Sequence, residues 1–156
     1  MFAVNEWCDG YYFNASGIYT EAYQINYNAN GGSPTPAMQT KFPNTNLTLT
    51  NTTPTKTNYK IAGWSTSSSA TEPTYFKYGS SYTYTANAGA TLYAVWGKNG
   101  DVNLNNAVNI EDINIVNALI MGKTPAKNYH WVTGDVNRDG VINIADINMI
   151  TSIIYS

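Results

Sequence analysis

Oxygen-bearing side chains recur at regular positions in one short window near the end of the chain. In GDVNRDGVINIAD, residues 134 to 146, five of them occupy positions 1, 3, 5, 9 and 12 of a loop: Asp135, Asn137, Asp139, Asn143 and Asp146. Gly140 stands at position 6, where such a loop turns sharply, and Val141 offers its main-chain carbonyl at position 7. Oxygen ligands at this spacing suit a hard cation such as Ca²⁺. The window therefore predicts a calcium loop.

The same pattern occurs a second time, in GDVNLNNAVNIED at residues 100 to 112. Its side chains at positions 1, 3, 5, 9 and 12 are Asp101, Asn103, Asn105, Asn109 and Asp112, and Ala107 stands at position 7. An Asx-rich surface turn could explain one such window, but two windows in register favour two calcium sites. The acids of residues 98–156 all lie inside the two windows, which favours metal binding over surface solvation: Asp101, Glu111, Asp112, Asp135, Asp139 and Asp146.

A helical pattern follows each loop. Apolar residues with the i, i+3, i+7 spacing of a core stripe are Ile113, Val116, Ile120 and, in the second copy, Ile147, Ile150, Ile154. Gly122 and Pro125 end the first helix. Only three residues separate Trp96 from Gly100, too few for a helix that enters the first loop. Each repeat is therefore predicted to be a loop plus its exiting helix, half of an EF-hand.

A second apolar stripe lies about 200° around these helices from the first. Its members are Ile115, Leu119, Met149 and Ile153. Because so small a module cannot bury both stripes in one core, at least one helix is expected to present an apolar patch to a protein partner.

Residues 98–156 resemble the dockerin module of cellulosomes, since GDVN, a calcium loop and a D-[LI]-x-[LI]-[LI] helix start match both 100 to 121 and 134 to 155. The resemblance implies two Ca²⁺ sites and binding to a cohesin module of a scaffoldin. It implies that cohesin contacts lie on or beside the second stripe, at Ile110, Glu111, Asn117, Ala118, Ile144, Ala145, Thr151 and Ser152. Many dockerins carry Ser-Thr and Lys-Arg pairs at these places, so a different cohesin specificity is expected. The two repeats also differ from each other here, which weakens the expectation of symmetric, two-orientation binding.

The first 97 residues have the pattern of a β-rich region. YQINYNA alternates Tyr23, Ile25, Tyr27 and Ala29 on one face, and the NGG turn follows. Further strands are predicted at 46–50, 58–64, 80–86 and 91–96, separated by Pro, Ser, Thr and Gly-rich connectors.

The phrases NYNANGG, NYKIAGWST and ATLYAVW resemble the Listeria-Bacteroides repeat of bacterial surface proteins. The resemblance implies a small β-grasp-like spacer or adhesion module over residues 22–97, in a surface or secreted setting. The predicted fold class is therefore α+β and multidomain: the β module at 22–97 and an all-α dockerin at 98–156. Residues 1–21 are expected to be the end of a preceding module or a linker, with sugar stacking by Tyr11, Tyr12 and Phe13 as the alternative.

Composition excludes several classes of partner. Only 12% of residues are charged and the net charge is −2 with no basic run, which argues against nucleic acid and against an anionic membrane surface. No apolar stretch approaches the roughly 20 residues that span a bilayer. The N-terminus lacks the features of a signal peptide, so Met1 is expected to begin a segment of a longer protein. The single Cys8 forms no internal disulfide.

The chain is predicted to be non-catalytic. The acids outside the loops are isolated, no Ser-His-Asp or Cys-His pattern occurs, and the single His130 is interpreted as a packing or linker residue. The favoured function is a calcium-dependent anchor that attaches a secreted protein, itself polysaccharide-degrading or structural, to a cellulosome-type complex. A carbohydrate or cell-surface adhesin fragment is the alternative. A calcium sensor is disfavoured, because half-hands lack the entering helices that reorient in a sensor.

Overall fold

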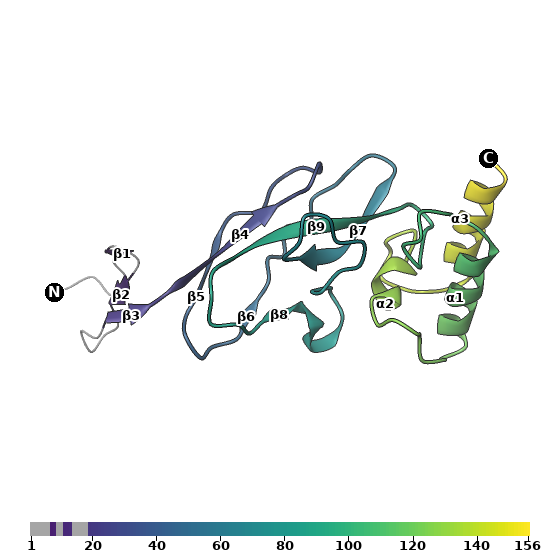
Figure 1. The fold of residues 1–156 in the computed structure, drawn as a ribbon. Helices are drawn as coiled ribbons and strands as arrows, with labels where there is room; N and C mark the ends of the chain where they lie inside the picture. The colour runs from purple at the N-terminus through teal and green to yellow at the C-terminus, as the bar shows by residue number, and fades with distance from the viewer. Residues whose placement is uncertain (1–6, 9–10, 14–18) are drawn as a thin grey trace.

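The computed structural model describes residues 7–8, 11–13 and 19–156. At one end of the molecule, β1 (Trp7–Cys8), β2 (Tyr11–Phe13) and β3 (Tyr19–Glu21) form an antiparallel meander. The helices lie at the other end, with the main sheet between the two (Figure 1). The predicted sugar stacking by residues 11–13 concerns side chains outside the described part of the chain.

The main sheet has four strands in the order β5-β4-β9-β7, formed by β4 (Tyr23–Asn28), β5 (Gln39–Lys41), β7 (Tyr59–Ser65) and β9 (Ala90–Lys98). The central strands β4 and β9 run parallel, and the outer pairings are antiparallel. We call residues 23–98 the β module. A separate ribbon pairs β6 (Leu47–Thr48) with β8 (Thr83–Tyr84), and η1 (Gly79–Tyr82) precedes β8.

Burial along β4 follows the predicted alternation. Ile25 and Tyr27 are buried while their neighbours Gln24 and Asn26 are exposed, because successive side chains of a strand point to opposite faces. The turn after β4 needs the left-handed backbone that its sequence suggested, with φ of 48° at Asn30 and 89° at Gly31. The first core forms on this face of the sheet, from Ile25, Tyr27, Leu49, Trp64, Tyr84, Leu92 and Ala94.

The prediction of a strand over residues 80–86 is wrong for the first half of that segment. The η1 turn occupies Gly79–Tyr82, and only two residues pair as β8. The Tyr82 hydroxyl donates to the Thr50 carbonyl at 2.6 Å and accepts from Trp64 Nε1 at 3.2 Å. These tertiary contacts, which local propensity does not encode, determine the conformation there.

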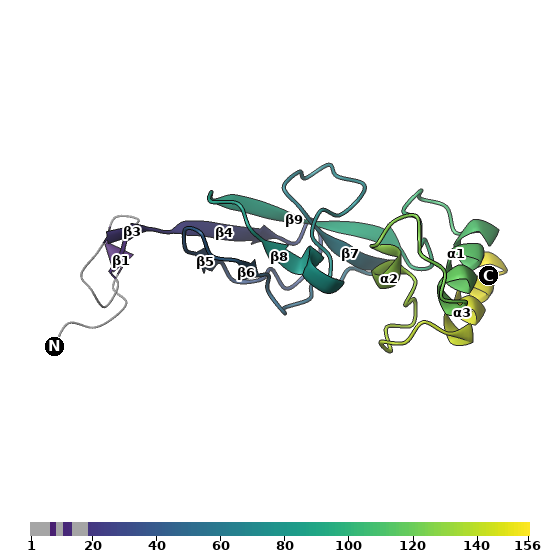
Figure 2. The same cartoon turned by 90° about the horizontal axis from the view of Figure 1, so that it is seen from below.

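We call residues 99–156 the helical module; it contains α1 (Ile110–Ile120), α2 (His130–Thr133) and α3 (Ile144–Ile154). Helices α1 and α3 pack side by side (Figure 2). Their small core consists of Val102, Val116, Val136 and Ile150, with partly buried isoleucines around it. Ile120 was predicted to join this stripe but is 42% exposed, because α1 ends at this residue. None of the described helices is long and apolar enough to cross a membrane.

The short helix α2 corrects one prediction. Its single turn leads through Gly134 into the second loop, so this loop does have an entering helical turn. The first loop is instead entered by β9, as the short spacer after Trp96 requires.

The two modules share a hydrophobic cluster that sequence reasoning did not predict. Leu104 and Tyr129 of the helical module pack with Ala62, Phe76 and Val95 of the β module. A Cβ on Gly97 would lie 2.5 Å from Leu104 Cδ2, so a glycine is required where β9 passes this side chain. The helical module thus contacts the end of the β module through a cluster distinct from the first core (Figure 1).

Candidate calcium loops and partner face

The carboxylate at position 1 organises each loop in the same way. In the first loop Asp101 accepts the backbone N–H groups of Asn105 at 3.1 Å and Asn106 at 2.9 Å. In the second loop Asp135 accepts those of Asp139 at 3.2 Å and Gly140 at 3.1 Å. The partners stand at positions 5 and 6 in both loops, so the first aspartate makes the same backbone bonds in each.

The carboxylates at position 12 are fully buried and close each loop onto its own helix. Asp112 accepts N–H groups from Val102 at 2.7 Å and Asn109 at 2.9 Å. Asp146 accepts those of Val136 at 2.8 Å and Asn143 at 2.9 Å. Each therefore ties position 2 of the loop to the start of the exiting helix.

The position 9 residues, predicted as metal ligands, cap the helices. The side-chain oxygen of Asn109 accepts from the Glu111 N–H and that of Asn143 from the Ala145 N–H, both at 2.7 Å. Each asparagine forms a capping box with the aspartate three residues later, which satisfies helix N–H groups that have no intrahelical partner. A ligand role at position 9 remains a prediction.

Both loops place positions 4 and 6 in the left-handed region. The φ angles are 60° at Leu104 and 69° at Asn106 in the first loop, and 65° at Arg138 and 85° at Gly140 in the second. Glycine adopts this conformation without penalty and asparagine tolerates it, so position 6 carries suitable residues in both copies.

Among the described residues, no carboxylate of these loops forms an ion pair. Burial raises the pKa of the Asp101 carboxyl, and the nearby Asp112 adds to this, while the N–H groups of Asn106 and Asn105 oppose it. The described residues contain one ion pair, Lys127 with Glu72, and it involves neither loop. A bound cation would offset the cost of keeping these carboxylates ionised.

The donor chemistry of each loop fits calcium. Among the described residues no three His, Cys, Asp or Glu side chains cluster as a ready metal site, so a cation must also draw on amide and main-chain oxygens. In the second loop Asn137 Nδ2 donates to Asp139 Oδ2 at 2.8 Å, which places position 3 beside position 5. Such a mixed set of oxygen ligands is typical of Ca²⁺, whereas zinc sites rely mainly on Cys and His.

Comparison with known families agrees with the loop geometry. The family model described as Dockerin type I domain matches residues 99–154, and that of the Listeria-Bacteroides repeat domain matches residues 23–95. The chain carries a Listeria-Bacteroides repeat followed by a dockerin. No curated protein and no solved structure matches it. Dockerins are non-catalytic modules that bind calcium and cohesins and imply cellulosome-type, extracellular association.

The dockerin exposes apolar residues at the start of both long helices. Ile110 is 61% exposed and Ile144 is 63% exposed, and they occupy the same place in the two repeats. Of the predicted second stripe, Met149 is 40% exposed, whereas Leu119 is buried and would meet any Cβ placed on Gly134. The accessible part of the stripe therefore lies on α3.

The other predicted partner positions lie on the same two helices. Asn117, Ala145 and Ser152 are exposed, while Ile115, Ala118, Thr151 and Ile153 are half-buried. The exposed Glu111 accepts weakly from Asn103 and Asn105 of its own loop, and the Thr151 hydroxyl donates to the Ile147 carbonyl at 2.8 Å. His130 is buried, in keeping with a packing residue, and burial lowers its pKa.

The contacts between the dockerin and the β module were missed in the sequence. Lys127 Nζ lies 2.9 Å from Glu72 Oε2, and the Tyr129 hydroxyl donates to Glu72 Oε1 at 3.2 Å. Arg138 Nη2 donates to the Tyr59 carbonyl at 2.9 Å. The sequence signal for these contacts was the apolar Leu104, which stands where the second loop carries Arg138. We call these contacts between the two modules the joint.

Proposed function

We propose that residues 98–156 anchor the chain to a cohesin module of a scaffoldin in a calcium-dependent manner. The observation that carries the proposal is the repetition, in both loops, of the same carboxylate-to-backbone bonds that lead into a capped, partly apolar helix. Local order of this kind suits a rigid binding surface, whose positions are fixed before the partner arrives.

Calcium is assigned to two sites. We infer that the ligands come from Asp101, Asn103, Asn105, Ala107, Asn109 and Asp112 in the first, and from Asp135, Asn137, Asp139, Val141, Asn143 and Asp146 in the second. When bound, the ion supplies charge neutralisation and fixes the loop, while the chain's own capping boxes set the direction of each helix. Helix orientation and partner binding thus depend on the same loops.

We place the partner face on the exposed apolar residues of α1 and α3, centred on Ile110, Ile144 and Met149. Exposed apolar groups of this size beside polar neighbours are typical of protein interfaces. Equivalent positions of the two repeats carry different residues, such as Glu111 in the first and Ala145 in the second. This difference favours one docking orientation on cohesin over the orientation in which the two repeats exchange places.

A pull-down from culture supernatant tests the anchor. The 156-residue chain is used as bait with calcium and, in parallel, with EDTA. Recovery of one scaffoldin-type partner only in calcium supports the proposal. Retention on insoluble glucan regardless of calcium would instead support the alternative, a carbohydrate or cell-surface adhesin.

Three further proposals concern the β module, the N-terminal segment and the parent protein. We propose that 22–97 is a non-catalytic, β-grasp-like spacer whose parallel central strands β4 and β9 resemble that fold, and that 1–21 belong to a preceding module or linker. The parent protein is proposed to be secreted and polysaccharide-directed, with any catalytic activity in another module. A variant of the parent protein that cannot bind cohesin should therefore lose its attachment to the scaffoldin and keep any catalytic activity that the parent has.

A further inference from the structure

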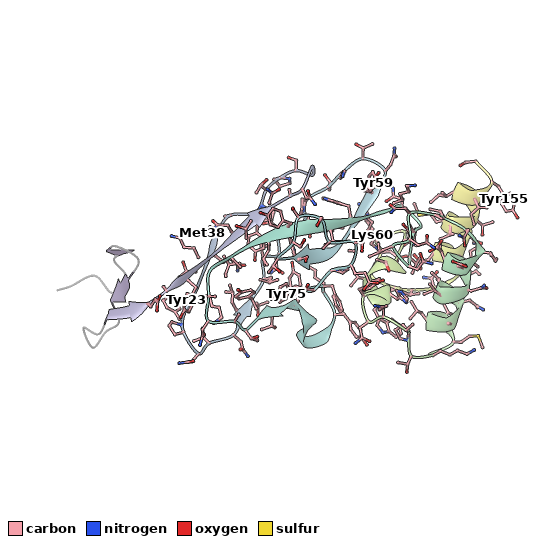
Figure 3. All side chains as sticks on the ribbon, viewed as in Figure 1. Tyr23, Met38, Tyr59, Lys60, Tyr75 and Tyr155 are labelled. Atoms are coloured by element: carbon pink, nitrogen blue, oxygen red, sulfur yellow. The ribbon has the colours of Figure 1, made fainter. Side chains whose placement is uncertain are left out.

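A cavity of about 410 Å³ lies between the β module and the dockerin. Its walls come from Tyr59 and Lys60 on β7, Lys77, Trp96 on β9, Trp131 on α2 and Arg138 in the second loop. Figure 3 shows Tyr59 and Lys60 at the end of the β module that faces the helices. The volume falls in the range of about 300 to 1,000 Å³ that is usual for small-molecule sites.

The cavity gathers more positive than negative charge. Lys60, Lys77 and Arg138 line it, against the single acid Asp135, which belongs to the second calcium loop. The one ion pair among the described residues, between Lys127 and Glu72, involves none of these cations. Arg138 donates to the neutral Tyr59 carbonyl at 2.9 Å, and Lys77 Nζ lies 3.3 Å from Thr53 Oγ1. On a chain of net charge −2, this is a local excess of cations.

The aromatic walls are held in place. Trp96 Nε1 donates to the Ala29 carbonyl at 3.0 Å, and the Trp131 ring stacks on Tyr78 with centroids 5.7 Å apart and an interplanar angle of 13°. Fixed aromatic faces receive the apolar face of a ring at little cost in side-chain entropy. Cations beside such faces add recognition of an anionic substituent through charge-assisted hydrogen bonds.

We propose that this cavity binds a carboxylated sugar ring, a uronic acid unit, with its carboxylate toward Lys60 and Arg138 and its ring against the tryptophans. A neutral sugar would leave the excess of positive charge unbalanced, and a simple carboxylate would leave the aromatic faces uncovered. The site is separate from the partner face on α1 and α3 and does not depend on cohesin binding.

The test uses the whole 156-residue chain at constant, saturating calcium, with the indole N–H signals of Trp96 and Trp131 followed by NMR. The probes are glucuronate, methyl glucoside, acetate and an acidic tetrapeptide. We expect glucuronate alone to shift these signals in a saturable way. Lys60→Met should weaken glucuronate binding about tenfold or more, as the loss of a charged hydrogen bond implies, and the exposed Lys123→Met should leave it unchanged.

Other outcomes would overturn the assignment. Equal affinity for acetate would mean a simple anion site, equal affinity for methyl glucoside would remove the role of the cations, and tighter binding of the peptide would mean a peptide site. Absence of saturable shifts, or an unchanged affinity in Lys60→Met, would also refute it. If Lys60→Met lowers the melting temperature markedly, Arg138→Met serves as the second variant and must show the same weakening.

Discussion

In the first loop of the dockerin, Leu104 at position 4 is 9% exposed and packs into the β module. In the second loop Arg138 stands at the same position, is exposed, and donates to the Tyr59 carbonyl and to Asn99 Oδ1. The backbone is the same in both, with a left-handed residue at this position and matching bonds to the first aspartate. Position 4 does not belong to the expected ligand set, so its side chain is free to take another role. The first loop therefore contacts the β module through a buried apolar side chain, and the second contacts it through exposed polar bonds.

Calcium removal should have the largest effect on both repeats. Because the loop carboxylates form no ion pair among the described residues, we expect metal binding and folding of the helical module to be coupled. EDTA should abolish most of the helical circular dichroism at 222 nm, while the β module keeps its own core and its near-ultraviolet signal. Unchanged helicity in EDTA would count heavily against coupled folding.

Substitution at position 4 should separate the two loops. Leu104→Ala removes a buried side chain shared by two modules and should lower the free energy of unfolding by about 2 to 4 kcal/mol. The matched variant Arg138→Ala removes exposed polar contacts and should cost about 1 kcal/mol or less. Urea unfolding in calcium measures the free energy lost in each variant. Equal losses would mean that Leu104 contributes no more to the contact between the modules than Arg138 does.

Ligand charge should rank the two sites for calcium. The second loop offers three carboxylates at ligand positions, Asp135, Asp139 and Asp146, and the first offers two, Asp101 and Asp112. The second site should therefore bind calcium more tightly. Exchanging the residues at position 5, by Asp139→Asn together with Asn105→Asp, should make the first site the tighter one. We expect its calcium affinity, measured by calorimetry, to exceed that of the second site about tenfold. Two equal sites in the unmodified chain would contradict the ranking.

The smallest effect concerns the ion pair across the joint. Its hydrogen bond to Lys127 lowers the pKa of Glu72 below the ordinary 4.5. The stabilisation is thus present above about pH 4.5 and is lost as the pH falls through the lowered pKa. Glu72→Gln should cost under about 1 kcal/mol at pH 7, and its melting temperature should converge on that of the unmodified chain toward pH 3. A difference that persists at pH 3 would assign the effect to packing.

The features predicted from the sequence are those encoded locally. The loops hold together through bonds between residues at most ten positions apart, such as Val102 with Asp112, so a pattern of Asp and Asn suffices to find them. Likewise, the alternation of Ile25 and Tyr27 gives the inward face of β4 directly.

The missed features depend on distant partners or on segments too short to show a period. The contact between the two modules pairs Glu72 with Tyr129, 57 residues later in the chain, and no local sequence pattern predicts such a pairing. Helix α2 has four residues, about one turn, so no apolar period can appear in it. Burial of Leu119 depends on Gly134 coming close, which only the packing of α1 against the second loop decides.

Binding to a panel of recombinant cohesins, with the chain immobilised for interferometry, tests directly whether the dockerin is a calcium-dependent anchor. We predict that at least one cohesin binds in calcium and is released by EDTA. Met149→Asp on the exposed side of α3 should weaken this binding while calcium affinity and helicity survive. Met121→Asp, exposed beyond the end of α1, is the matched control and should bind normally. A cohesin that binds equally well in EDTA, or a folded, calcium-loaded chain that binds none, would contradict this prediction.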